Sequence, residues 1–148
     1  MPTEPRAAAE ALARAVGEFW VERLGPRLLG FYLLGSLAHG GYSARYSDID
    51  VGLVADDGIE DDDSAAMRAF AAAAEPELAA KLSLFWADRA FSRGRFPPLD
   101  RLDYLDHAQP LIEREHAAPP RPNRNDVRTY LRGRPLDSWR EQIARVTA

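Results

Sequence analysis

Two short motifs in the first third of the chain carry residue types suited to phosphate and metal chemistry. Gly35-Ser36 follows a nearly continuous apolar run, and Asp48-Ile49-Asp50 opens a second one. Two acids at i and i+2 on a strand project from the same face, so both carboxylates reach one small volume. Carboxylate oxygens suit Mg²⁺ or Mn²⁺, and a Gly-Ser turn presents backbone N–H groups and a hydroxyl to a phosphate oxygen. Together the motifs predict a site for a nucleoside triphosphate with its divalent ion.

Hydrophobic periodicity predicts the elements that position these motifs. An amphipathic helix is expected over residues 5–24, where it ends at Gly25-Pro26. Residues 35–47 read as a loop with one short helical turn. Strands are expected at residues 28–34, 48–54, 82–87 and about 111–112. Two further helices are expected at about 64–74 and 99–107. Residues 120–148 read as two helical pieces split at Gly133-Arg134-Pro135, a C-terminal extension of a single domain spanning 1–148.

Composition excludes several classes of protein. At 148 residues there is room for one domain. The chain has no cysteine, which excludes a disulfide framework, thiolate zinc sites and a Cys nucleophile. No segment approaches the ~20 apolar residues of a membrane span, and the start MPTEPRAAAE has no apolar signal region. We therefore expect a soluble, cytoplasmic protein with no membrane partner. A net charge of -4 argues against a dedicated duplex-DNA binder.

The 22-residue stretch from Leu33 to Val54 resembles the signature of the nucleotidyltransferase superfamily. It reads LLGSLAHGGYSARYSDIDVGLV, that is, hydrophobic-Gly-Ser, a spacer, then Asp-hydrophobic-Asp. The stretch is most similar to the minimal nucleotidyltransferases and to the N-terminal domains of aminoglycoside nucleotidyltransferases, with a looser match from about residue 12 to Glu115. The resemblance implies an α/β fold of the nucleotidyltransferase, DNA polymerase β-like type. That fold has a small mixed β-sheet with helices mainly on one face.

The resemblance also implies residue roles and an activity. Asp48 and Asp50 would ligate Mg²⁺ or Mn²⁺, Gly35 and Ser36 would hold the terminal phosphates, and Asp48, Asp50 and Ser36 would be the catalytic residues. The implied reaction transfers an NMP from an NTP, with ATP expected, to a hydroxyl acceptor and releases pyrophosphate. The acceptor stays open among protein, antibiotic, RNA end and DNA primer. Small members of the superfamily complete the acceptor side with a second copy or another chain, so we expect a homodimer or a helical partner protein.

One departure from the family pattern leaves the activity open. The third carboxylate, usually on the next strand, corresponds to Ser83 in LSLFWAD. The nearest acids are Glu77, before that strand, and Asp88, which a β-bulge would have to re-aim. Family members without the third acid often act as binding modules. The alternative hypothesis is therefore a degenerate module that binds nucleotide or a partner protein, such as the toxin of a toxin–antitoxin pair.

The candidate cations of the site also differ from the family pattern. His39 stands where minimal members often have arginine, and we predict it as a phosphate contact, with Arg45 as a second nucleotide-binding candidate. The arginines of the C-terminal extension, among them Arg124, Arg128 and Arg132, are candidates for contact with a partner or an anionic substrate. A solvated helix face is the alternative explanation for them.

Three other nucleotide or hydrolase motifs fail on their required residues. The Gly35–Gly41 stretch has the spacing of a Walker A loop, but Gly41 and Tyr42 stand where Lys and Ser/Thr are required. No Gly occupies the middle position of a Gly-x-Gly-x-x-Gly fingerprint, and the chain has no Gly-x-Ser-x-Gly elbow.

Overall fold

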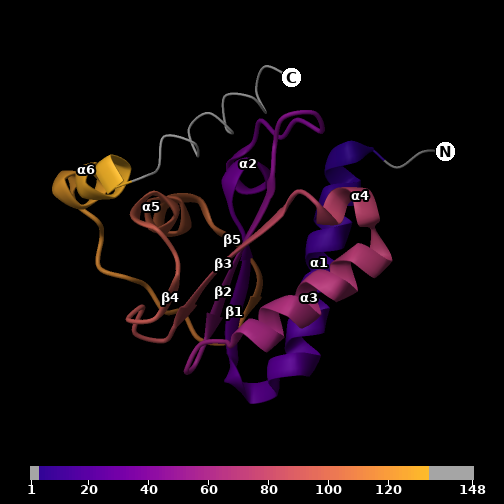
Figure 1. The fold of residues 1–148 in the computed structure, drawn as a ribbon, viewed down its shortest axis with the longest axis horizontal. Helices are drawn as coiled ribbons and strands as arrows, with labels where there is room; N and C mark the ends of the chain where they lie inside the picture. The colour runs from indigo at the N-terminus through magenta and orange to yellow at the C-terminus, as the bar shows by residue number, and fades with distance from the viewer. Residues whose placement is uncertain (1–3, 134–148) are drawn as a thin grey trace.

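A five-stranded mixed sheet forms the centre of the molecule, which we describe from a computed structural model covering residues 4–133 (Figure 1). Its strands lie in the order β4-β3-β2-β1-β5. β2 pairs with β3 in parallel, and the other three pairings are antiparallel. The strands are β1 (Leu28–Leu33), β2 (Ile49–Ala55), β3 (Leu82–Asp88), β4 (Gly94–Arg95) and β5 (Gln109–Glu113).

Helices lie on both sides of the sheet, and the two longest, α1 and α3, share one face (Figure 1). α5 packs on the opposite face, and the short α2 directly follows β1. The helical elements are α1 (Pro5–Leu24), the 3-10 turn η1 (Gly25–Arg27), α2 (Gly35–His39), α3 (Asp61–Ala74), α4 (Pro76–Ala79), α5 (Pro98–His107) and α6 (Arg124–Gly133). This α/β architecture with a small mixed sheet confirms the expected fold class.

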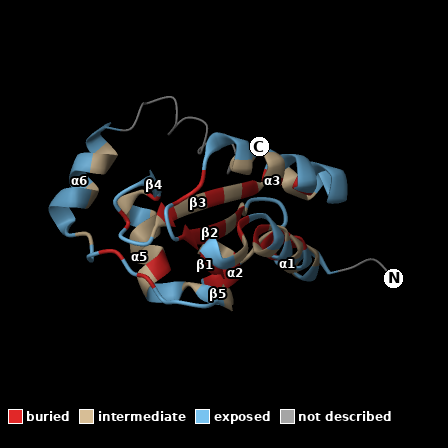
Figure 2. Ribbon diagram, turned by 90° about the horizontal axis from the view of Figure 1, so that it is seen from below, coloured by how far each residue is buried: buried red, intermediate tan, exposed pale blue. Residues whose placement is uncertain are grey.

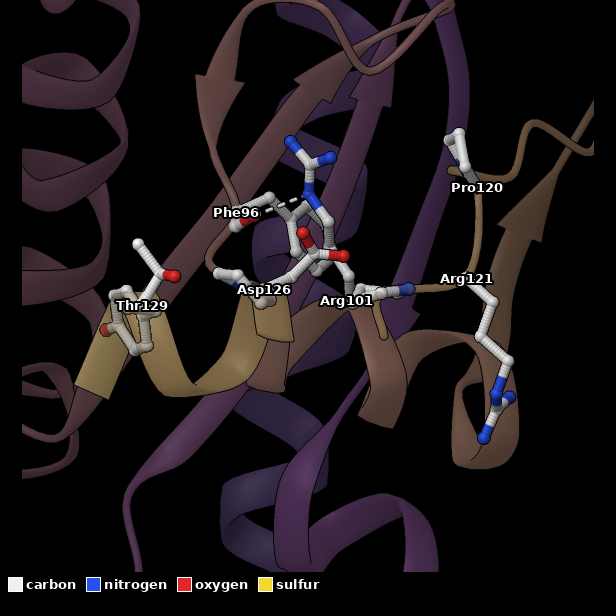
Figure 3. A pocket seen from close by; sticks show the side chains of 9 residues that line it. Phe96, Arg101, Pro120, Arg121, Asp126 and Thr129 are labelled. Atoms are coloured by element: carbon white, nitrogen blue, oxygen red, sulfur yellow. Dashed lines mark hydrogen bonds between the residues drawn. The ribbon is translucent and has the colours of Figure 1, made fainter. Parts of the chain in front are cut away.

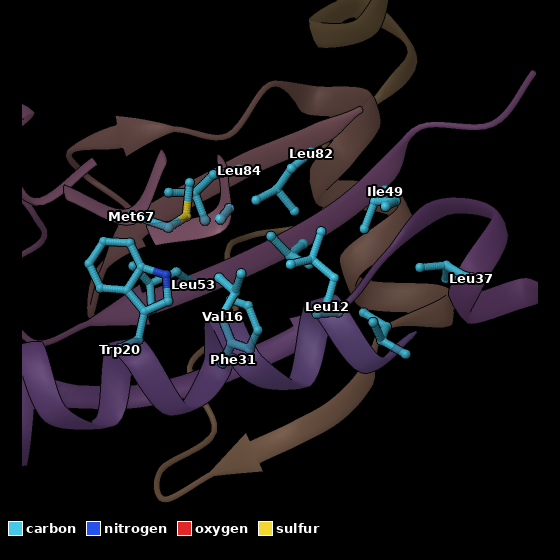
Figure 4. Packing of buried hydrophobic residues seen from close by; sticks show 14 of the residues in the cluster. Leu12, Val16, Trp20, Phe31, Leu37, Ile49, Leu53, Met67, Leu82 and Leu84 are labelled. Atoms are coloured by element: carbon cyan, nitrogen blue, oxygen red, sulfur yellow. The ribbon is translucent and has the colours of Figure 1, made fainter. Parts of the chain in front are cut away.

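The main core lies between the sheet and the α1–α3 layer (Figure 4). Leu12, Val16 and Trp20 recur at four-residue spacing on α1, so they form one buried stripe. On β2 the alternating residues Ile49 and Leu53 meet that stripe, and both are fully buried. Burial of this kind contributes roughly 1.5–3 kcal/mol per large apolar side chain. The stripe therefore fixes which face of β2 points away from α1.

A second, smaller core fills the opposite face of the sheet. It contains Tyr32 and Leu34 from the end of β1, Val54 from β2, Phe96, and Tyr104 from α5. All six residues of β1 are buried, because alternate side chains contribute to the two cores. Figure 2 shows buried residues concentrated in the central strands, whereas α6 is mostly exposed. The prediction that this strand is buried on both faces is confirmed.

Most predicted elements are present with small shifts at their ends. α3 begins at Asp61, three residues earlier than expected, because Glu60 and Asp63 form a reciprocal capping box and the acids of its first turn suit the helix dipole. β4 was not predicted, since a two-residue strand has no periodicity to detect. Of the predicted C-terminal extension, the first helical piece is α6, and residues 134–148 lie outside the described residues. No helix within residues 4–133 has the length and apolar character needed to cross a membrane.

We predict that Tyr104→Phe lowers the free energy of unfolding by about 1–2 kcal/mol. The Tyr104 hydroxyl donates a hydrogen bond of 2.6 Å to the carbonyl of Ala117 inside the second core, and phenylalanine leaves that carbonyl unsatisfied. Urea unfolding followed by circular dichroism measures the change. Tyr46→Phe is the control, because Tyr46 is 48% exposed and its loss of a hydroxyl should change stability by less than about 0.5 kcal/mol. Equal changes in the two variants would contradict the assignment.

Candidate functional site

The antiparallel pairing of β1 with β2 brings the two predicted motifs together. Leu33 pairs with Val51, and the backbone N–H of Leu34 donates to the carbonyl of Asp50 at 2.9 Å. Gly35 comes next, with φ +56, and a Cβ at this position would overlap Oδ2 of Asp50. Because a side chain is excluded here both by space and by conformation, glycine lets the turn lie directly against the carboxylate. The Gly-Ser turn and the Asp-x-Asp motif are therefore neighbours, as predicted.

Asp50 lies in an environment that disfavours its charge. Burial, reinforced by the nearby charges of Asp48, Asp100 and Asp103, raises the pKa of Asp50 to about 7. Asp48 immediately precedes β2, whereas Asp100 and Asp103 come from α5. These four residues, which we call the acid cluster, combine two segments about 50 positions apart in the sequence. Like charges in a partly buried group are costly unless a cation or a proton compensates them.

Asp103 contacts the backbone of the Gly-Ser turn directly. Its Oδ2 accepts a hydrogen bond of 2.6 Å from the N–H of Gly35, and its Oδ1 lies 4.0 Å from Nε2 of His39. The ring of His39 in turn packs edge-on against that of His107 at 5.3 Å between centroids. α5 therefore supplies an acid to the position where the sequence predicts a phosphate contact.

The position expected for a third carboxylate holds Ser83. Ser83 on β3 pairs in register with Asp50 on β2, so the two residues are neighbours on adjacent strands. Asp88 cannot substitute for it, because Asp88 pairs with Ala55 at the other end of the same two strands, roughly 16 Å away at the usual rise per residue. There its carboxylate accepts hydrogen bonds from the backbone and hydroxyl of Ser92. The third acid next to Asp50 comes from α5 and not from β3.

The remaining candidate residues occupy positions around the turn. Ser36 lies in the first turn of α2, half-buried, and its carbonyl accepts the N–H of Gly40 at 3.0 Å. His39, at the end of α2, is 44% exposed and faces Asp103. Arg45 is exposed in the loop before β2, with its guanidinium 5.2 Å from the ring centroid of Tyr46. Glu77 is exposed on α4 and is not among the acids that raise the pKa of Asp50.

The side chains of the acid cluster offer the kind of oxygen donors that a hard divalent cation prefers. Every donor that the cluster offers is a carboxylate oxygen, which matches Mg²⁺ or Mn²⁺. Within residues 4–133, no three His, Cys, Asp or Glu side chains are arranged as a complete metal-ligand set. Two carboxylates suffice for Mg²⁺, because this ion keeps several waters and takes further ligands from substrate phosphates. Asp48 and Asp50 would be those two ligands.

A hollow that no residue of the acid cluster lines lies between α5, α6 and the proline-rich segment that precedes α6 (Figure 3). Its volume is about 570 Å³, and Phe96, Pro98 and Tyr130 supply much of its apolar lining. The guanidinium of Arg101 donates to the carbonyl of Phe96 at 2.7 Å, and Arg121 pairs with Asp106 at 2.8 Å. The two arginines of this hollow are thus engaged by the protein, and no member of the acid cluster lines it.

Sequence reasoning missed Asp100 and Asp103 altogether. Both belong to the α5 sequence PLDRLDYLDH, in which acids recur every three residues. That spacing places Asp100 and Asp103 on neighbouring turns of one helix face. The buried Tyr104 gives the orientation of α5 against the sheet. The three-residue spacing of the acids can be seen in the sequence, but it does not indicate that α5 lies beside α2.

The comparisons with known proteins found similarity only among solved structures. No family model matches the chain, and no curated protein matches it. A toxin–antitoxin crystal structure with AMP-PNP contains a chain 20% identical to this one, covering 91% of this chain and 98% of the other, with a TM-score of 0.48. A toxin–antitoxin MntA–HepT structure gives 16% identity, 94% and 99% coverage and a TM-score of 0.44. A structure of the tri-AMPylated Shewanella oneidensis HEPN toxin in complex with MNT antitoxin contains a chain 18% identical to this one. The match covers 94% of this chain and 99% of the other, with a TM-score of 0.45.

We predict that Gly35→Ala destabilises the protein by more than Gly41→Ala does. Both glycines have positive φ, so alanine costs roughly 1–2 kcal/mol of backbone strain at either position. At Gly35 the added Cβ also overlaps Oδ2 of Asp50, whereas at Gly41 it meets open space. We expect a difference of at least about 1 kcal/mol in the free energy of unfolding, measured in urea. Equal losses would show that the turn does not lie against Asp50.

We predict that Asp50→Asn stabilises the protein at pH 8 in metal-free buffer, by about 1–2 kcal/mol. The pKa of Asp50 is about 7 in the folded protein, against 3.8 for an aspartate in its ordinary solvated state, so ionising it costs folding free energy as the pH rises between these values. The difference between variant and wild type should vanish near pH 4. Urea unfolding at several pH values measures it. The control Asp57→Asn, at an exposed acid paired with Arg27, should change stability by less than about 1 kcal/mol, and no gain for Asp50→Asn at pH 8 would contradict the prediction.

Proposed function

We propose that this chain is a metal-dependent nucleotidyltransferase, which transfers an NMP from an NTP such as ATP to a hydroxyl acceptor. The observation that carries the proposal is the contact between the Gly35 turn and the Asp50 carboxylate. It joins a backbone suited to phosphate oxygens with a carboxylate pair suited to Mg²⁺ or Mn²⁺.

In the proposed reaction the chain positions the nucleotide and provides the electrostatic environment. The N–H groups and hydroxyl at Gly35 and Ser36 hold the terminal phosphates, and His39 adds a contact at the end of α2. Asp48 and Asp50 would hold the divalent ion beside the reacting phosphate. When bound, that divalent ion would neutralise charge on the phosphates and on the acid cluster.

The bond changes follow from this placement. The acceptor oxygen forms a bond to the α-phosphorus, the bond from that phosphorus to the bridging oxygen breaks, and pyrophosphate leaves. The hydroxyl proton passes to a carboxylate or to water. Because Ser83 carries no carboxylate, a protein base for this proton would have to come from Asp48, Asp50 or α5.

The second candidate function is a degenerate module that binds nucleotide or a partner protein without catalysing transfer. Two observations favour it. Ser83 stands beside Asp50 in place of an acid, and Asp103 already engages the Gly35 N–H. A protein partner such as a toxin, or a second copy of the chain, would then be the functional ligand. Nucleotide binding without turnover would distinguish this candidate from the enzyme.

We predict that incubation with labelled ATP, Mg²⁺ or Mn²⁺ and candidate hydroxyl acceptors gives nucleotide transfer that Asp48→Ala and Asp50→Ala each reduce at least about 100-fold. Removal of the divalent ion with EDTA should abolish transfer. The control Asp57→Ala, at an exposed acid 74% accessible to solvent, should keep wild-type activity. Binding of ATP without transfer would favour the second candidate, and absence of both would overturn the proposal.

A further inference from the structure

One carboxylate of α5 accepts a hydrogen bond from Gly35 and lies near His39, two residues to which the proposed function assigns phosphate binding. Oδ2 of Asp103 accepts the Gly35 N–H at 2.6 Å, and Oδ1 lies 4.0 Å from Nε2 of His39. A carboxylate, like a phosphate, spreads negative charge over oxygens that accept hydrogen bonds from N–H donors. Asp103 therefore stands, relative to Gly35 and His39, where a phosphate oxygen of the nucleotide would stand.

The packing of α5 holds Asp103 in this position. The next residue, Tyr104, is 3% exposed, packs edge-on against Tyr32 at 5.0 Å between ring centroids, and donates its hydroxyl to Ala117. These contacts attach α5 to the face of the sheet. The Asp103 side chain itself is 23% exposed, so it retains contact with solvent. Its backbone is thus anchored, and rotation of the side chain alone would free the Gly35 N–H.

We infer that Asp103 is an autoinhibitory group, which occupies the Gly35 N–H in the free protein and must be displaced from it before a nucleotide phosphate binds there. This inference rests on the proposed function. Two effects make Asp103 oppose the nucleotide: the Gly35 N–H already has a charged acceptor, and the carboxylate repels the triphosphate.

The direct test compares the affinity for ATP of the wild type and of Asp103→Asn, in the full chain with Mg²⁺. Asparagine keeps the size of the side chain and removes its charge. Isothermal titration calorimetry should give a Kd about tenfold lower for Asp103→Asn. The matched control is Asp106→Asn, the same change one turn along α5, where the acid pairs with Arg121 at 2.8 Å. Its Kd should stay within about twofold of the wild-type value.

A second measurement needs neither nucleotide nor metal. In ¹H–¹⁵N NMR spectra, the amide proton of Gly35 should move upfield in Asp103→Asn, because a charge-assisted hydrogen bond is replaced by a weaker neutral one. The same amide should keep its position in Asp106→Asn. Circular dichroism of both variants establishes that each is folded.

The outcomes separate this inference from the proposed function. Tighter binding by Asp103→Asn, or binding by that variant alone, supports autoinhibition. An equal or weaker affinity in the folded variant, or an unmoved Gly35 amide, overturns it while leaving the proposed function in place. If neither the wild type nor Asp103→Asn binds ATP with Mg²⁺ or Mn²⁺, both are overturned, because no nucleotide remains for Asp103 to exclude.

Discussion

The antiparallel pairing of β1 and β2 is the constraint on which the candidate site depends. A single register places Val51 opposite Leu33, and the hydrogen bond from Leu34 to Asp50 closes the ladder at the point where β1 ends. A slip of one residue would turn every β2 side chain to the other face. Asp50 would then point into the apolar core against α1, and Ile49 would face the turn. Burial of the apolar face of β2 therefore fixes the direction of the carboxylate.

This constraint carries an electrostatic cost for the folded protein. Asp50 stays half-buried among Asp48, Asp100 and Asp103 because the apolar contacts of β2 and the packing of Tyr104 hold their backbones in place. Concentrated like charge of this kind destabilises a compact state and is typical of sites that bind a compensating cation or substrate. The same packing explains how Asp103 reaches the Gly35 N–H, since the anchored Tyr104 is its neighbour in the chain.

Sequence reasoning succeeded where local periodicity carries the information. The helix over residues 5–24 has the predicted bounds, since an apolar stripe and a Gly-Pro terminator are local signals. Comparison with the family pattern singled out Ser83, which the structure places beside Asp50 on the neighbouring strand. The two acids that α5 brings to the site could not be predicted in this way, because their position depends on which helix packs on that face of the sheet. Asp100 and Asp103 have an ordinary solvent-exposed pattern until Tyr104 is placed against Tyr32. The suggested role of Asp88 failed because strand length, and not only parity, separates it from Asp50.

The position of β5 beside β1 affects the order in which contacts form during synthesis and folding. Tyr32 and Glu113, which share a hydrogen bond between β1 and β5, are 81 positions apart, and α5 immediately precedes β5. Closing so long a loop is slow compared with forming the contacts between α1 and its neighbouring strands. Because synthesis proceeds from the N-terminus, a nascent chain has Gly35 and Asp50 available before Asp103 has been added. The Gly35 N–H is therefore made before the segment that supplies its acceptor, and the contact with Asp103 forms only once α5 has packed against the sheet.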